Sequence, residues 1–252
     1  MILLRAICRT VFVFALTFAS YGGVVAARLL GLLGPRFALR LRNRVFRTWA
    51  RGLCWAFGMK SRVEGVAPRG QFFLIANHVS YVDIVLLASY VDIAFVAKSD
   101  LRHWPALGRI FEAADTIFID RSKKRDVVRV MGLVGKEIDR GLGVLVFPEG
   151  TSGKGDQLLP FKPSLLEFAC TRDLPVHWAT LHYETPAGHP PASRSVCWWG
   201  DEGFGSHYKR LIALPSFTAV LRFGEEPILH ADRKELAVAL REKMLEKFVP
   251  IE

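Results

Sequence analysis

A histidine and an aspartate five residues apart are the side chains of this sequence best suited to acid–base chemistry. His78 and Asp83 lie in the segment Asn77-His-Val-Ser-Tyr-Val-Asp83. In a continuous helix the two side chains would diverge by about 140°, and in a strand they would face opposite sides. They can therefore meet only if the chain turns between them.

The surrounding residues predict such a turn. An apolar run that ends at Ala76 is typical of a buried strand, and Ser80 with Asp83 forms a candidate capping box that opens a helix. Asp83 would then accept one imidazole N–H and fix the tautomer, which leaves the other nitrogen of His78 free to act as a base. Spacing alone equally allows Asp83 to be only a helix cap and His78 an ordinary turn residue.

Short apolar runs alternate with helical stretches over the rest of the chain. We expect strands at 72–76, 94–97, 116–119, 144–147, 176–181 and 217–223, and helices at 124–140, 163–172 and 232–248. This alternation predicts an α/β fold with a mostly parallel central sheet flanked by helices. We place a catalytic domain at 59–252, preceded by an N-terminal two-helix membrane-attachment segment at 1–58.

The positive charge of the chain is concentrated at its N-terminal end. The net charge is +10, and no acidic residue precedes Glu64, whereas eleven arginines and lysines do. A nucleic-acid-binding protein could have a similar charge, but its basic residues would not normally be interleaved with so apolar a segment. The pattern therefore favours binding to a membrane surface.

Residues 11–27 carry no charge and have an arginine on either side. A helix of that length spans about 26 Å, slightly less than the ~30 Å hydrocarbon core of a bilayer. Arginines at both ends give no orientation by the positive-inside rule. We therefore expect a shallow or re-entrant helix with both ends on the cytoplasmic side. A cleaved signal peptide is the competing interpretation.

A second helix is predicted after Gly34-Pro35. Its arginines fall on one side and its apolar residues occupy most of the remainder; the one-sided set is Arg36, Arg40, Arg44, Arg47 and Arg51. Such a helix is suited to lying in the head-group layer, apolar side down and arginines on lipid phosphates. The alternative is a solvated charged face on an ordinary packed helix.

The cysteines and the later histidines show no spacing typical of a metal or redox site. The four cysteines are far apart and are best explained as reduced residues of a cytosol-facing domain. We expect neither a metal nor a cofactor.

Four blocks of this sequence resemble the signature of the glycerolipid acyltransferases, a group that contains bacterial lysophosphatidate acyltransferases. Asn77-His78-x-x-x-x-Asp83 resembles the first block. The other blocks follow in family order; they are Thr116-Ile-Phe-Ile-Asp120-Arg121, Phe147-Pro-Glu-Gly-Thr151 and, as a partial match, Leu174-Pro-Val176. The resemblance covers about residues 60–230. No Gly-x-Ser-x-Gly elbow of a thioesterase or lipase is present.

The resemblance implies that His78 is a general base for a lysolipid hydroxyl that attacks an acyl thioester, with Asp83 orienting it. No covalent acyl-enzyme is needed, and acyl-CoA or acyl carrier protein would be the co-substrate. The substrate-binding residues implied by the family are Arg121, Glu149, Gly150 and Thr151, and Lys98, at the end of a predicted strand, is a further head-group candidate. Arg121 would bind phosphate through a fork of hydrogen bonds. Gly150 would let the backbone approach the ligand, and exposed amides there could stabilise an oxyanion.

Two departures bear on the acceptor. Ser152 stands where the phosphatidate-forming enzymes usually carry an arginine. The run Val196-Cys-Trp-Trp-Gly-Asp201, followed by His207, resembles a subgroup that includes lyso-ornithine-lipid acyltransferases; a buried or membrane-facing strand is the simpler interpretation of the Trp pair.

The leading hypothesis from the sequence is acylation of the sn-2 hydroxyl of lysophosphatidate, giving phosphatidate for phospholipid synthesis. The alternative acceptor is lyso-ornithine lipid or another lysophospholipid. A non-catalytic membrane-binding protein of the same fold is the alternative of another class. We expect membrane association at the cytoplasmic face, in a bacterium at the inner membrane.

Overall fold

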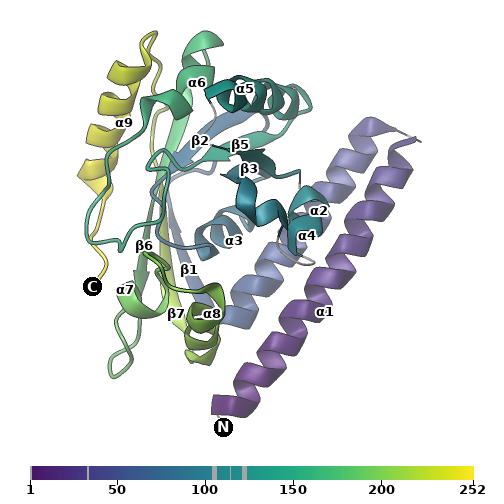
Figure 1. Ribbon diagram of the computed structural model, residues 1–252, viewed down its shortest axis with the longest axis vertical. Coiled ribbons are helices and arrows are strands. Elements are labelled where there is room, and N and C mark those ends of the chain that lie inside the picture. The colour runs from purple at the N-terminus through teal and green to yellow at the C-terminus, as the bar shows by residue number, and fades with distance from the viewer. Residues whose placement is uncertain (1, 33, 104–106, 114, 121–123) are drawn as a thin grey trace.

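A long helical hairpin lies along one side of an α/β domain in the computed structural model, which describes residues 2–32, 34–103, 107–113, 115–120 and 124–252 (Figure 1). The hairpin is formed by α1 (Ile2–Leu29) and α2 (Pro35–Phe57). Proline at the first position of α2 needs no hydrogen-bonded N–H, and Gly58 ends that helix in the left-handed conformation. The two predicted N-terminal helices are therefore present.

The described part of the chain forms a seven-stranded sheet in the order β1-β7-β6-β2-β5-β3-β4. The strands are β1 (Met59–Glu64), β2 (Phe72–Ala76), β3 (Ile93–Lys98), β4 (Ile117–Ile119), β5 (Gly143–Val146), β6 (Val176–Glu184) and β7 (Phe217–Phe223). Neighbouring strands are parallel except β6 and β7. The expected mostly parallel α/β fold is confirmed. Strand β1 was not expected, because it is a mostly exposed edge strand without an apolar run.

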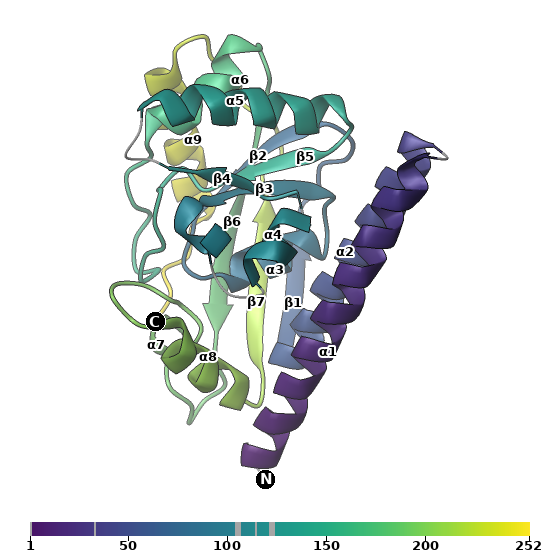
Figure 2. The same ribbon diagram turned by 45° about the vertical axis from the view of Figure 1, so that its right-hand side comes forward.

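Helices cover both faces of the sheet (Figures 1 and 2). One face packs against α2, α3 (Val82–Ala88) and α8 (Phe204–Ala213); the other packs against α5 (Lys124–Asp139), α6 (Glu167–Thr171) and α9 (Arg233–Lys247). Along β2, Phe72 and Leu74 enter the first core, whereas Phe73 and Ile75 enter the second. Every residue of this strand is buried, as expected for a parallel strand covered on both faces.

The apolar side of α2 packs on the sheet rather than in a membrane. Phe46, Ala50, Leu53 and Phe57 are buried in the core that also contains α3. The expected arrangement, with the apolar side of this helix in the head-group layer, is therefore wrong. An apolar stripe buries equally well against lipid or protein, so the periodicity could not distinguish the two. The placement of a domain boundary at residue 58 stays a prediction.

The exposed apolar surface belongs to α1 instead. This helix is long and apolar enough to cross a membrane, and its outward side chains include Leu3, Val11, Phe14 and Phe18. Its two early arginines point inward to the end of α8: Arg5 Nη2 donates to Ala213 O at 2.6 Å, and Arg9 Nη1 donates to Leu214 O at 2.6 Å. The outer face is therefore apolar from the first turn. Its depth in a bilayer stays a prediction.

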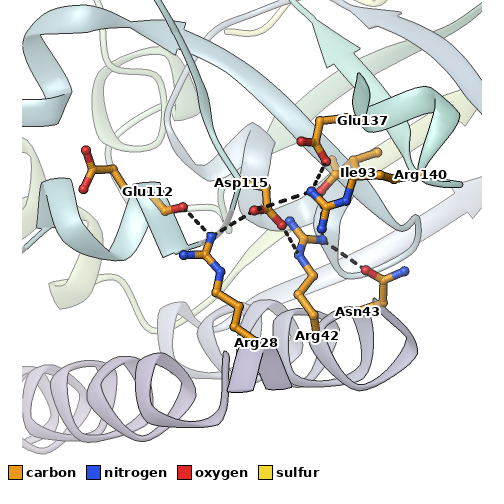
Figure 3. A network of polar contacts seen from close by, with 8 residues as sticks. All are labelled: Arg28, Arg42, Asn43, Ile93, Glu112, Asp115, Glu137 and Arg140. Carbon is orange, nitrogen blue, oxygen red and sulfur yellow. Dashed lines mark hydrogen bonds and ion pairs between the residues drawn. The ribbon is translucent and has the colours of Figure 1, made fainter. Parts of the chain in front are cut away.

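A buried arginine joins the hairpin to the sheet (Figure 3). Arg42 is 3% exposed; its guanidinium donates to Asp115 Oδ2 at 3.1 Å and to Ile93 O at 3.3 Å. Arg28 on α1 donates to the other oxygen of Asp115 at 2.9 Å. A buried charge is tolerated when it is paired and hydrogen-bonded in this way. One aspartate thus fixes both helices of the hairpin to the α/β domain.

Replacing Leu53 by alanine should lower the free energy of unfolding by about 2–5 kcal/mol, because it leaves a cavity between α2 and the sheet. Phe37→Ala on the same helix is the matched control, since Phe37 is 58% exposed. It should change stability by no more than about 0.5 kcal/mol. Urea unfolding in detergent measures both. Equal effects would show that α2 does not pack on the core.

Candidate active site

The candidate catalytic residues gather where neighbouring parallel strands end. His78 follows β2, and Glu149 follows the adjacent strand β5. Lys98 is the last residue of β3, which pairs with β5. Open α/β sheets bind ligands at this carboxyl edge. Asn77 fixes the exit of β2, because its amide exchanges two hydrogen bonds with the backbone of Leu181, at 2.7 and 3.0 Å.

The Asp83 carboxylate accepts four hydrogen bonds. Its Oδ2 lies 2.8 Å from His78 Nδ1 and accepts the backbone N–H groups of Val79 and Ser80 at 2.8 and 2.9 Å. Its Oδ1 accepts the hydroxyl of Tyr183 at 2.7 Å. The predicted turn therefore exists. Asp83 both caps the turn and contacts the imidazole, and the catalytic role of His78 stays a prediction.

Only half of the predicted capping box forms. Helix α3 begins at Val82 with Tyr81 in the capping position, and the buried Ser80 hydroxyl has no partner among the described residues. Tyr81 already has helical backbone angles, so the N–H of Asp83 donates to the Ser80 carbonyl at 3.2 Å. The predicted Ser80 cap is therefore wrong, whereas the return bond from Asp83 to the Ser80 N–H is present.

The imidazole of His78 is fixed by contacts with Phe147 and Asp83. Its ring stacks on Phe147, with centroids 4.0 Å apart and an angle of 16° between the planes. Because the Asp83 carboxylate can only accept, Nδ1 carries the N–H in this contact. Within the described structure Nε2 has no hydrogen-bond partner, and the side chain is 21% exposed. This nitrogen is available to accept the proton of a bound hydroxyl.

Tyr183 is a site residue that sequence reasoning missed. Complete burial, followed by the nearby charge of Asp83, raises the pKa of its hydroxyl well above the usual value. The hydroxyl therefore stays protonated and donates to Asp83. It lies on β6, a hundred residues after the aspartate, so no local pattern could connect the two.

Glu149 holds the backbone around His78. Its Oε1 accepts the N–H of His78 at 2.7 Å, and its Oε2 accepts the N–H of Leu159 at 3.0 Å. Burial raises the pKa of this carboxyl to about 7. Gly153 adds a third link, because its N–H donates to the His78 carbonyl at 2.9 Å. The geometry shows a positioning role for Glu149, and its contact with an acceptor stays a prediction.

Lys162, which the sequence pattern did not point to, lies next to Gly150. Gly150 has a left-handed φ of 75°, and a Cβ there would lie 2.8 Å from Lys162 Nζ. Glycine is therefore required by the backbone conformation, whereas the flexible Lys162 side chain could move aside. Thr151 is exposed in the same turn. The side chain of Lys98 and all of Arg121 lie outside the described residues, so their roles stay predictions.

The segment that contains Trp198 and Trp199 is hydrogen-bonded to the catalytic turn. The N–H of Trp198 donates to the Val79 carbonyl at 2.7 Å. His207 on α8 lies 3.2 Å from the Tyr81 hydroxyl, and burial lowers the pKa of His207 to about 4, so it is neutral at physiological pH. The segment connects α7 (Ala192–Ser195) to α8 without forming a strand. The strand interpretation of the Trp pair is therefore wrong.

Comparison with known proteins identifies the family. A family model described as Acyltransferase matches residues 60–179. A lyso-ornithine lipid O-acyltransferase from Pseudomonas aeruginosa is 32% identical over 229 residues, which cover 84% of this chain and 87% of that protein. The chain belongs to this acyltransferase family. A protein of the same name from Rhizobium meliloti is 32% identical over 216 residues, 79% of this chain and 73% of its own.

Other relatives of this acyltransferase carry a different name. A 1-acyl-sn-glycerol-3-phosphate acyltransferase from Neisseria meningitidis is 30% identical over 207 residues, 81% of this chain and 79% of that protein. The crystal structure of a 1-acyl-sn-glycerophosphate acyltransferase from Thermotoga maritima shares the fold, with a TM-score of 0.69 and 20% identity over 98% of both chains. The enzyme is therefore an acyltransferase of the lysolipid type.

Asp83→Asn should reduce kcat about 10²–10⁴-fold, because the amide cannot both orient Nδ1–H and stabilise the imidazolium that forms in the reaction. Tyr183→Phe is the graded comparison. It removes one donor to the carboxylate and should cost only about tenfold in kcat. Steady-state kinetics on folded protein, checked by circular dichroism, tests the order. Equal losses would contradict the assigned roles.

Glu149 should make stability depend on pH. Because the pKa of its carboxyl is about 7 in the folded protein, above the ordinary 4.5, the folded state keeps a proton that the unfolded state loses between these values. Stability from this group is therefore greatest at low pH and falls as pH rises toward 7. Between pH 4.5 and 8 the wild type should lose about 3 kcal/mol relative to Glu149→Gln. Parallel urea-unfolding profiles would refute this.

Proposed function

We propose that this acyltransferase transfers a fatty acyl group from acyl-CoA or acyl carrier protein to the free hydroxyl of a membrane lysolipid. Nε2 of His78 takes the hydroxyl proton while the oxygen attacks the thioester carbonyl. The thiolate then leaves as the tetrahedral intermediate collapses, and the imidazolium returns the proton to it. The products are an ester and a free thiol. The observation that carries this proposal is the Asp83 carboxylate, which accepts four hydrogen bonds, one of them from the His78 imidazole.

The apolar outer face of α1 supports action at a membrane, because lysolipid acceptors reside there. The four free cysteines and the water-soluble thioester donors support a position at the cytoplasmic face. A non-catalytic role for the fold is disfavoured, since a protein that only binds membranes has no need of a buried carboxylate ordered around a free imidazole nitrogen.

Lyso-ornithine lipid is the acceptor that we favour. Two relatives of that name are 32% identical to this chain. Ser152 stands in the turn after Glu149-Gly150-Thr151, where an arginine would suit a phosphate. Ornithine lipid has no phosphate, so it does not require this arginine. The Trp198 segment, which the sequence analysis linked to the same subgroup, is bonded to the catalytic turn.

Lysophosphatidate, acylated at its sn-2 hydroxyl to give phosphatidate, is the second candidate. Lys162 favours it, because this ammonium group lies over Gly150 and could bind a phosphate in place of the missing arginine. The similarity to the Neisseria meningitidis enzyme supports the same acceptor.

A panel of lysolipids with both thioester donors tests the proposal. The wild type should esterify lyso-ornithine lipid with a higher kcat/KM than lysophosphatidate. His78→Ala should lower kcat about 10²–10⁴-fold with every acceptor, because it removes the base. His189→Ala, at an exposed loop histidine, is the control and should keep full turnover. Substantial turnover by His78→Ala would refute the mechanism.

A further inference from the structure

An open groove of about 460 Å³ belongs to a segment that is hydrogen-bonded to the catalytic turn, and the reaction described above does not use it. It is formed by the α7–α8 segment, and its lining includes Cys197 and Trp199, the two neighbours of Trp198. The N–H of Trp198 is bonded to Val79, the residue after His78. Helices α7 and α8 lie beyond the end of the sheet toward which β6 points (Figure 2). A head group in this groove would therefore contact the two neighbours of a residue that is hydrogen-bonded to the catalytic turn.

Two opposite charges line this groove without pairing. Arg194 and Asp201 are both exposed, and neither side chain forms a hydrogen bond or ion pair with another described residue. Glu202 and Arg210, in contrast, pair with each other at 2.6 Å. A free cation and a free anion on one wall of a groove can be satisfied together by a ligand that carries both charges.

Trp199 lies between Arg194 and Asp201 in the sequence, and it also lines the groove. Trp199 is 43% exposed, although its indole N–H is held by the Ser193 carbonyl at 3.1 Å. The ring is therefore fixed in place while part of its surface remains open. A fixed, exposed indole is the best side chain for attracting an ammonium group over its face.

We propose that this groove binds a zwitterionic amino-acid head group. Arg194 binds the carboxylate, and Asp201 with the Trp199 ring binds the ammonium group. The inference rests on the proposed function, in which a lysolipid is esterified at His78. An ornithine attached to a fatty chain through one amino group keeps a carboxylate and a second ammonium, which matches both charges. A phosphate monoester has no cation for Asp201 to bind, so it does not match the paired charges of this groove.

Kinetics with lyso-ornithine lipid in mixed micelles test the site. Arg194→Gln and Asp201→Asn should each raise KM about tenfold and leave kcat within about twofold, as expected when binding is lost equally in ground and transition states. The KM for lysophosphatidate should not change. Arg69→Gln and Asp139→Asn are matched controls, because both residues are exposed and precede β2 and β5 at the opposite edge of the sheet.

A modified substrate sharpens the assignment. Lyso-ornithine lipid methyl ester lacks the carboxylate, so the wild type should show about the same tenfold rise in KM as Arg194→Gln shows with the parent lipid. Arg194→Gln should show no further rise with the ester. Additive effects of the substitution and the ester would overturn the proposed contact.

Two further results separate this inference from the proposed function. If the wild type acylates lyso-ornithine lipid and both variants keep its KM, the groove is not the head-group site and the function stands. If the wild type acylates no lysolipid, the function fails, and titration of lyso-ornithine lipid into the wild type and Arg194→Gln then tests the groove directly. Equal dissociation constants, or the same change in the two control variants, would overturn the site.

Discussion

The buried carboxylate of Asp83 is the constraint around which the site is organised. Its two oxygens accept one imidazole N–H, two backbone N–H groups and one phenol. A charge with no solvent exposure is costly unless its hydrogen-bonding capacity is filled, and here the donors come from the turn itself and from β6. The carboxylate of Asp83 is thus removed from solvent and the imidazole of His78 is oriented by the same arrangement. The same contacts that make burial tolerable also aim the imidazole.

The neighbouring strands extend this organisation. Glu149, at the end of β5, connects the His78 backbone to the loop that contains Leu159, and Phe147 supports the imidazole face. Trp198 connects the same turn to α7 and α8. The His78 segment is therefore held by the Glu149 carboxyl, the Phe147 ring and the backbone N–H of Trp198, whereas Nε2 of His78 has no hydrogen-bond partner in the described structure. Rigid support around one free atom is the arrangement that preorganised catalysis requires.

Patterns within a few residues of the sequence predicted much of the fold and of the candidate site, whereas contacts between residues distant in the sequence were not predicted. The spacing of His78 and Asp83 demanded a turn, and apolar runs located most of the strands, because those signals lie within a few residues. Tyr183 and Lys162 were missed, since their partners are distant in sequence. The apolar face of α2 was assigned to lipid, because a pattern of burial does not state what covers it. Strand β1 was missed because an exposed edge strand has no apolar signature.

The inward arginines of α1 give that helix a second role. The last turn of α8 leaves carbonyl groups without intrahelical partners, and Arg5 and Arg9 supply the missing donors. Helix α8 in turn carries His207, which contacts Tyr81 at the start of α3. The long apolar helix α1 is thus also a structural cap for α8. Removal of α1 would therefore also leave the last carbonyls of α8 without these donors and would loosen the helix that contacts the start of α3.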